Sequence, residues 1–114
     1  MKLDETNFEA IAGKTLETFM EAIDETLGDR LDVDLDNGIL TMELPTGAQY
    51  VLNKHAPNRQ IWMSSPLSGA SHYAYDEKTG QWLSIRGGEK LNEVLAGELS
   101  SAMGGNVSLV ARHM

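Results

Sequence analysis

The sequence predicts an α+β protein with a two-layer α-β sandwich, in which two helices cover one face of an antiparallel meander of about six strands. Apolar residues recur every three or four positions near each end of the chain, which indicates an amphipathic helix at both ends. Between them, short stretches of alternating apolar and polar residues are separated by turn residues, as in antiparallel strands joined by tight turns. Each helix needs an apolar surface to cover, so we expect both helices on one sheet face and the other face open.

The first helix is expected to begin after Asp4 or Thr6, either of which can cap it, and to end at Gly28. Its apolar face consists of Phe8, Ile11, Ala12, Leu16, Phe19, Met20, Ile23 and Leu27. Its opposite face carries Glu17, Glu21, Asp24 and Glu25. Acidic residues four positions apart repel each other, and almost no lysine or arginine balances this face. A polar helix face is usually only solvated, but here the acidity continues beyond the helix.

The segment after this helix alternates strictly between apolar and acidic residues. It contains Leu31, Asp32, Val33, Asp34, Leu35 and Asp36. The alternation predicts a half-buried strand, and since aspartate is a poor strand former, three on one face indicate a purpose beyond folding. Asn37-Gly38 then predicts a two-residue hairpin turn before a return strand over 39–44. The acidic spacing resembles a calcium-binding loop, but Asn37 stands where that loop needs glycine, and Pro45 prevents the helix that should follow.

The remainder of the sequence predicts four more strands, over residues 48–54, 58–64, 71–76 and 81–85. A turn built on Ala56-Pro57-Asn58 leads into the second of these strands. A second amphipathic helix has apolar positions from Leu91 to Met103, and Gly104-Gly105 ends it. We expect the chain to pack back on the core through Val107, Leu109 and Val110. The length predicts a single domain over residues 1–110, followed by a frayed tail over 111–114.

The fourth predicted strand has two unlike faces. The core face carries Ile61 and Met63. The other face carries Asn58, Gln60, Trp62 and Ser64. A tryptophan that is aligned with amides and hydroxyls, and not with aliphatic side chains, indicates a surface made for contact. We therefore predict that Trp62 lies on the open sheet face and touches a partner.

The net charge of −8 argues against nucleic-acid binding, because phosphate contacts need lysine and arginine. Residues 1–43 hold 12 of the 17 acidic residues but only three of the nine basic residues, and this negative field attracts cations or a basic partner surface. The chain has no cysteine, which excludes disulfides and thiolate metal ligands. No apolar run is long enough for a membrane span, and the first residues show no signal or transit pattern, so we expect no membrane association and a cytoplasmic location.

A long run around the fourth predicted strand closely resembles the signature of the frataxin family. The run reads Asn53-Lys54 and, further on, Pro57-Asn58-Arg59-Gln60-Ile61-Trp62-Met63-Ser64-Ser65-Pro66-Leu67-Ser68-Gly69. The resemblance covers nearly the whole chain, including the acidic first helix and strand, the strand with Trp82 and the second helix. It implies the same two-layer sandwich that the residue pattern predicts independently. It also implies a location in the bacterial cytoplasm, or in the mitochondrial matrix if this is a processed eukaryotic form.

The resemblance implies weak iron binding on an acidic ridge along the first helix and first strand. Carried over residue by residue, the acidic ridge consists of Glu17, Glu21, Asp24, Glu25, Asp29, Asp32, Asp34 and Asp36. Carboxylates and water suit Fe²⁺ and Fe³⁺ and also Mn²⁺ and Ca²⁺, so we expect other divalent cations to substitute for iron. We expect the metal-free protein to be a monomer and iron to promote an oligomer.

The resemblance also implies a part in iron–sulfur cluster assembly, with contacts to a cysteine desulfurase and to the cluster scaffold protein. The partner-binding residues that it implies are Asn53, Gln60 and Trp62, to which we add His72, where many members of the family have an arginine. His55, His72 and His113 show no paired spacing, so we assign them no metal-binding role.

No nucleophile with a nearby base indicates a catalytic site, so an enzyme is not the expected outcome. Some members of the family are credited with oxidising Fe²⁺ to Fe³⁺, and the ridge alone does not decide this. Two alternatives to an iron-binding assembly factor therefore stay open. One is a ferroxidase or iron-storage protein, and the other is a protein-interaction module whose acidity serves docking without any metal.

Overall fold

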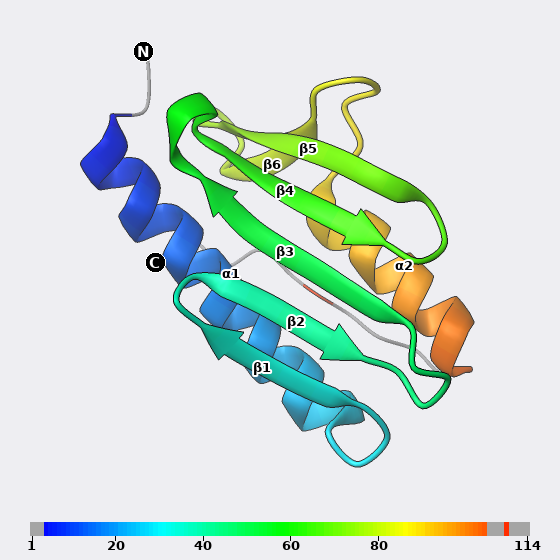
Figure 1. Cartoon of the computed structure of the whole chain (residues 1–114). Helices are drawn as coiled ribbons and strands as arrows, with labels where there is room; N and C mark the ends of the chain where they lie inside the picture. Colours follow the sequence, from blue (N-terminus) through cyan, green and yellow to red (C-terminus); the bar gives the residue numbers. More distant parts are fainter. Residues whose placement is uncertain (1–3, 105–108, 110–114) are drawn as a thin grey trace.

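The computed structural model describes residues 4–104 and 109, and it confirms the predicted two-layer architecture. Helices α1 (Glu5–Leu27) and α2 (Leu91–Met103) both lie on one face of a six-stranded sheet (Figure 1). The strands are β1 (Asp32–Asp36), β2 (Ile39–Glu43), β3 (Gln49–His55), β4 (Gln60–Ser65), β5 (Gly69–Asp76) and β6 (Gln81–Ser84). Neither helix covers the other face of the sheet, which is the face that Figure 1 presents to the viewer.

The strands are hydrogen-bonded in their order along the chain, and every neighbouring pair is antiparallel. This is the predicted meander, and it places β1 at one edge of the sheet and β4 inside it. In the turn between β1 and β2, φ is 53° at Asn37 and 77° at Gly38, as a type I′ turn requires. The positive φ favours glycine at residue 38, whereas the nearby Cε of Lys54 belongs to a flexible side chain that can move aside.

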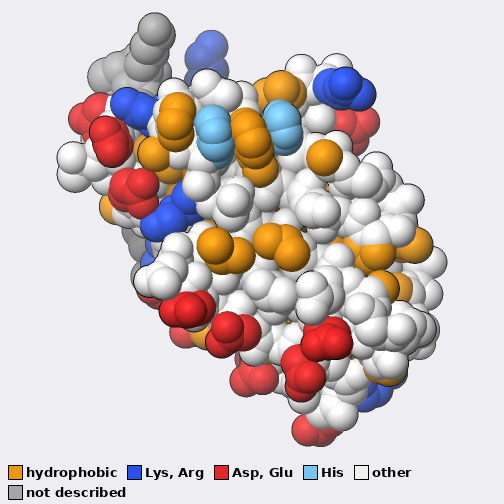
Figure 2. All heavy atoms as spheres, viewed as in Figure 1, with side chains coloured by type: hydrophobic (Ala, Val, Ile, Leu, Met, Phe, Trp, Pro, Cys, Tyr) orange, Lys and Arg blue, Asp and Glu red, His pale blue; other side chains and the backbone are white. Residues whose placement is uncertain are grey.

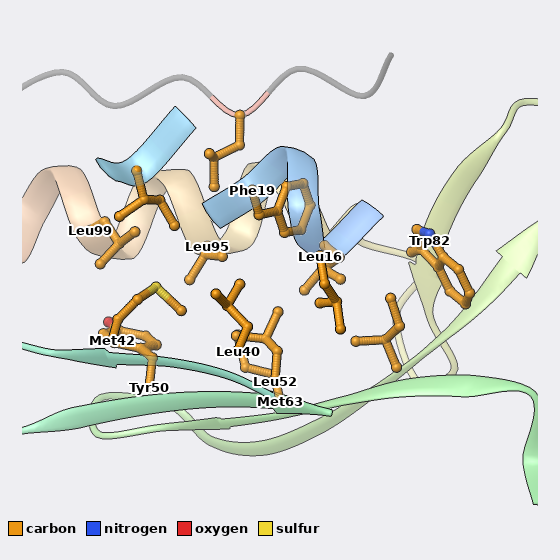
Figure 3. Close-up of a cluster of buried hydrophobic side chains, with 14 of the residues drawn as sticks. Leu16, Phe19, Leu40, Met42, Tyr50, Leu52, Met63, Trp82, Leu95 and Leu99 are labelled. Atoms are coloured by element: carbon orange, nitrogen blue, oxygen red, sulfur yellow. The ribbon is translucent and has the colours of Figure 1, made fainter. Parts of the chain in front are cut away.

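The core lies between the helices and the covered face of the sheet (Figure 3). Oδ1 of Asp4 accepts a 2.8 Å hydrogen bond from the backbone N–H of Asn7, which confirms Asp4 as the cap of α1. The helices bury Phe8, Ala12, Leu16, Phe19, Ile23, Leu27, Leu91, Leu95 and Leu99. The sheet buries Leu40, Met42, Tyr50, Leu52, Ile61, Met63, Tyr73 and Trp82. The buried sets match the apolar helix faces and the alternating strand faces that the sequence predicts.

The predicted turn before β4 is present, but the position of Asn58 differs from the predicted one. Residues Ala56–Asn58 form a single 3₁₀ turn, and Arg59 follows in the left-handed conformation with φ 55° and ψ 49°. Proline at the second position of this turn has a fixed φ that suits a helical turn and lacks the N–H that a strand would use. β4 therefore begins only at Gln60, and Asn58 lies in the turn and not on the strand face where alternation placed it.

The chain after α2 returns to the core at Leu109, which is buried. Nδ2 of Asn92 donates a 2.7 Å hydrogen bond to the carbonyl oxygen of Leu109, as part of this packing. Val107, Val110 and the predicted frayed tail, 111–114, lie outside the described residues. Neither of the two helices in the described part of the chain is long and apolar enough to cross a membrane.

Candidate functional site

The sheet face opposite the helices, which we call the open face, is formed by alternate positions of the strands. One row of paired residues crosses it from β1 to β5: Asp36, Ile39, Asn53, Trp62 and His72. Neighbouring strands are about 4.8 Å apart, so β1 and β4 are separated by roughly 14 Å. The aspartates of β1 therefore share one face with Trp62, and the strand part of the acidic ridge is continuous with the predicted contact face.

All eight residues of the acidic ridge are exposed. Figure 2 shows acidic side chains gathered along the edge of the sheet that β1 and β2 form. The ion pairs in the described part of the chain, Lys54–Glu9 and Lys90–Glu93, involve none of the eight. No three His, Asp or Glu side chains within residues 4–104 and 109 come together as a metal-binding group. The ridge is a row of separate carboxylates, which fits cations held by one or two carboxylates and water.

Glu43 extends this acidic surface, although the sequence analysis did not include it in the acidic ridge. It lies opposite Asp32 in the register of β1 and β2, on the open face, and it is exposed. Like charges directly opposite each other destabilise a sheet, so a cation that neutralises this pair stabilises the fold. Alternation along β2 places Glu43 outward, but only the register shows that it faces an aspartate.

Trp62 is held between two histidines on the open face. The ring centroid of His55 lies 3.7 Å from that of the indole with an interplanar angle of 11°, and that of His72 lies 4.1 Å away at 9°. The indole N–H donates a 2.7 Å hydrogen bond to Oε1 of Gln60. Figure 2 shows the two histidine side chains with a hydrophobic side chain between them. We call His55, Trp62 and His72 the ring ladder.

The four predicted partner-binding residues, Asn53, Gln60, Trp62 and His72, are half-buried and share the open face. The structure adds His55, to which the sequence assigned no role because the histidines are scattered along the chain. Its spacing of two from Asn53 indicates the same strand face. Its neighbours, however, depend on the 3₁₀ turn, which sets His55 opposite Gln60 and diagonal to Trp62.

The Ser-Ser-Pro part of the family-like run ties the turn between β4 and β5 to α2. Oγ of Ser65 donates a 2.5 Å hydrogen bond to Oε1 of Glu98 and accepts hydrogen bonds of 3.0 Å from the backbone N–H groups of Leu67 and Ser68. The hydroxyl of Tyr50 donates a 3.0 Å hydrogen bond to the same carboxylate oxygen. Burial, and then the neighbouring Glu98 carboxylate, raise the pKa of Tyr50 to about 12. This part of the run therefore serves the fold, whereas Gln60 and Trp62 serve the open face.

The fold and the open face define a class of small α+β proteins, with two helices on a six-stranded antiparallel meander and a row of carboxylates at one sheet edge. The sequence profile of the frataxin-like domain matches residues 1–105. This chain belongs to the frataxin family, as the residue run around Trp62 predicts.

Relatives come from mitochondria and from bacteria. The mitochondrial frataxin of Arabidopsis thaliana is 39% identical over 112 residues, which is 94% of this chain and 59% of that protein. The iron–sulfur cluster assembly protein CyaY of Thioalkalivibrio sulfidiphilus is 37% identical over 105 residues, which is 90% of this chain and 96% of that protein. The chain spans 59% and 40% of the lengths of the Arabidopsis and Saccharomyces cerevisiae relatives that it matches.

Solved structures share the fold. The frataxin of Psychromonas ingrahamii has a TM-score of 0.84, covers 94% of this chain and 98% of its own, and is 23% identical, which supports the fold alone. A trimeric frataxin of Saccharomyces cerevisiae, complexed with ferrous iron, has a TM-score of 0.75 at 36% identity and covers 82% of this chain and 86% of its own.

Proposed function

We propose that this chain is an accessory or regulatory protein of iron–sulfur cluster assembly that binds iron weakly on the acidic ridge. The observation that carries the proposal is the continuity of the open face, on which exposed, unpaired aspartates of β1 and the held Trp62 belong to one surface. Relatives that are named iron–sulfur cluster assembly proteins support the same role.

Iron fits this chain as a weakly held cargo. The donors are exposed carboxylates on α1 and β1, which are hard oxygen ligands and suit Fe²⁺, Fe³⁺, Mn²⁺ and Ca²⁺ alike. Because the carboxylates are spread over two elements, each cation takes one or two of them and keeps most of its water. The ferrous complex of the yeast relative supports iron among these cations.

The partners that we propose are a cysteine desulfurase and the cluster scaffold protein. The acidic ridge docks on basic side chains, while Asn53, Gln60, Trp62 and His72 make the shorter-range contacts on the open face. The metal-free chain is a monomer in this proposal, and iron drives its association, in line with the trimeric yeast relative. Neutralising the acidic edge is the physical reason, because charge repulsion between copies then falls.

The test is the rate of cluster formation by a purified cysteine desulfurase and scaffold protein, with and without this chain. Wild type is compared with Trp62→Ala and with a triple variant, Asp32→Asn, Asp34→Asn and Asp36→Asn. We expect both variants to return the rate towards that of the assay without the chain. Glu77→Gln, in the exposed turn between β5 and β6, is the matched control and should behave as wild type. An unchanged rate in both test variants contradicts the proposal.

The spread of the carboxylates also favours one second candidate, a protein-interaction module that needs no metal. The same assay separates the two when partner binding is measured with iron and with a chelator. If partner binding and the effect on the rate are the same with iron and with the chelator, the chain is a metal-independent interaction module. Oxidation of Fe²⁺ beyond the bound stoichiometry assigns a ferroxidase instead.

A further inference from the structure

The ring ladder closes both faces of the Trp62 indole. His55 comes from β3 and His72 from β5, on the two sides of β4, and their rings are stacked within 4.1 Å of the indole. An aromatic ring or a guanidinium group of a partner therefore finds no free indole face on which to stack. The ladder instead presents the edges of three parallel rings.

Those edges carry positive partial charge and hydrogen-bond donors. In an aromatic ring the face is negative and the edge positive. Gln60 uses Oε1 to accept the indole N–H, so its two amide hydrogens remain for an acceptor. Nδ1 of His55 is buried without a hydrogen-bond partner, which leaves Nε2 as the ring nitrogen that a partner can reach.

The open face is also divided in charge. On β1 and β2 its acidic positions are Asp32, Asp34, Asp36 and Glu43, and no lysine or arginine stands among the paired open-face positions there. On β3, β4 and β5 the paired positions are Val51, Asn53, His55, Gln60, Trp62, Ser64, Ala70, His72 and Ala74. None of these nine is a carboxylate, and the carboxylate on this half of the open face, Asp76, pairs with Gln81 at the far end of β5, four positions along the strand from His72. One half of the face repels anions, and the other half offers donors and ring edges.

We propose that the ring ladder binds a carboxylate of the partner protein, while the acidic half of the face meets basic side chains of the same partner. His55, Gln60 and His72 surround that carboxylate together with the edge of Trp62. The partner surface is then bipolar, with its basic and acidic groups roughly 14 to 19 Å apart, which is three to four strand spacings. The inference rests on the proposed function for the identity of the partner, and on the open face alone for its chemistry.

The chemistry of the ladder is tested on the isolated protein by collisional quenching of tryptophan fluorescence. Iodide and caesium report opposite signs of local charge, and Trp82, 4% exposed with its N–H bonded to Thr15, contributes little quenching. We expect the ratio of iodide to caesium quenching constants to exceed that of free N-acetyltryptophanamide, and His72→Glu to lower it. Trp62→Phe supplies the background from Trp82. A wild-type ratio below that of the free amide overturns the proposal.

The sign of the partner charge is tested by binding to the purified desulfurase and scaffold complex. We expect His72→Arg to bind at least as tightly as wild type and His72→Glu to bind roughly tenfold or more weakly. His72→Gln removes the ring without adding charge and is the matched control. Equal or tighter binding of His72→Glu relative to His72→Arg overturns the proposal. If wild type does not bind the desulfurase and scaffold complex, the proposed function is contradicted. The quenching ratio still tests the chemistry of the ring ladder in that case.

Discussion

The hydroxyl of Ser65 donates a 2.5 Å hydrogen bond to the carboxylate of Glu98, and this bond joins the end of β4 to α2. Ser65 is buried, and its oxygen also accepts the backbone N–H groups of Leu67 and Ser68, so one hydroxyl organises the whole turn between β4 and β5. This turn sets the alignment of β5, which carries His72, beside β4.

Replacing Ser65 by alanine should destabilise the fold by about 1–3 kcal/mol, because two partly buried backbone N–H groups lose their acceptor and the Glu98 carboxylate loses one of its donors. Urea unfolding followed by circular dichroism measures this. Ser64→Ala is the matched control, since Ser64 is the neighbouring residue on the exposed side of the strand and should change stability by less than about 0.5 kcal/mol. Equal effects of the two variants would show that the hydrogen bonds of Ser65 contribute nothing to the stability of the fold.

Stability should fall at high pH because of Tyr50. Its pKa is raised from 10.0 to about 12, so the unfolded chain loses this proton before the folded chain does. The contribution is fully present below about pH 10 and disappears as the pH rises towards 12, with a total of roughly 2–3 kcal/mol. Burial also raises the pKa of Tyr73, so Tyr50→Phe should reduce the fall without abolishing it. The measurement is the unfolding free energy between pH 9 and about 12. If it falls equally in wild type and in Tyr50→Phe, Tyr50 is not the cause of the fall.

Arg59 should be a site where glycine stabilises the fold. It occupies the left-handed region at φ 55°, which costs a side-chain-bearing residue about 1–2 kcal/mol, and its buried Nε has no hydrogen-bond partner. Arg59→Gly should raise the unfolding free energy by roughly 0.5–1 kcal/mol after its greater backbone entropy is included. Arg59→Ala keeps the backbone strain and removes the same side chain, so the difference between the glycine and alanine variants isolates the backbone contribution. A glycine variant that is no more stable than the alanine variant disproves the role of backbone strain.

Cations should raise the melting temperature, because they bind the folded row of carboxylates better than the unfolded chain. We expect Fe²⁺ under anaerobic conditions to do so, with Mn²⁺ and Ca²⁺ acting in the same direction, and high salt to shrink the effect. The triple asparagine variant of Asp32, Asp34 and Asp36 should show a smaller shift. Glu43→Gln should melt higher than wild type at low salt without any cation, since it removes the charge opposite Asp32. A flat titration with Fe²⁺ at low salt excludes cation binding on the acidic ridge.

Much of the fold follows from local pattern. The alternation of Val33 and Leu35 with the aspartates predicts both the strand and the face on which the acids stand, and Asn37-Gly38 predicts its turn. Periodicity likewise predicts the buried faces of both helices. The family-like run predicts that Trp62 lies on the open face, as the structure confirms.

The ring ladder was beyond sequence reasoning because it depends on register. His55 and His72 are 17 positions apart. The 3₁₀ turn before Gln60 brings His55 against Trp62, and the separate pairing of β4 with β5 brings His72 against it. A start of β4 at Asn58, as alternation predicts, would give a different pairing with β3. The pairing of Glu43 with Asp32 is hidden for the same reason, because alternation assigns a face but not a cross-strand neighbour.

The position of β1 at the sheet edge gives its aspartates a role in colloidal behaviour. An edge strand offers unpaired backbone groups on which a second chain can add a strand, and this is a common route to aggregation. Two β1 edges that approach each other bring six carboxylates together, so the bare chain resists such fusion. Cations on the same residues weaken that resistance, and light scattering of the chain should therefore rise when the ridge is titrated with Fe²⁺ and stay flat for the triple asparagine variant. One short strand then governs both how the chain meets metal and whether its copies stay apart.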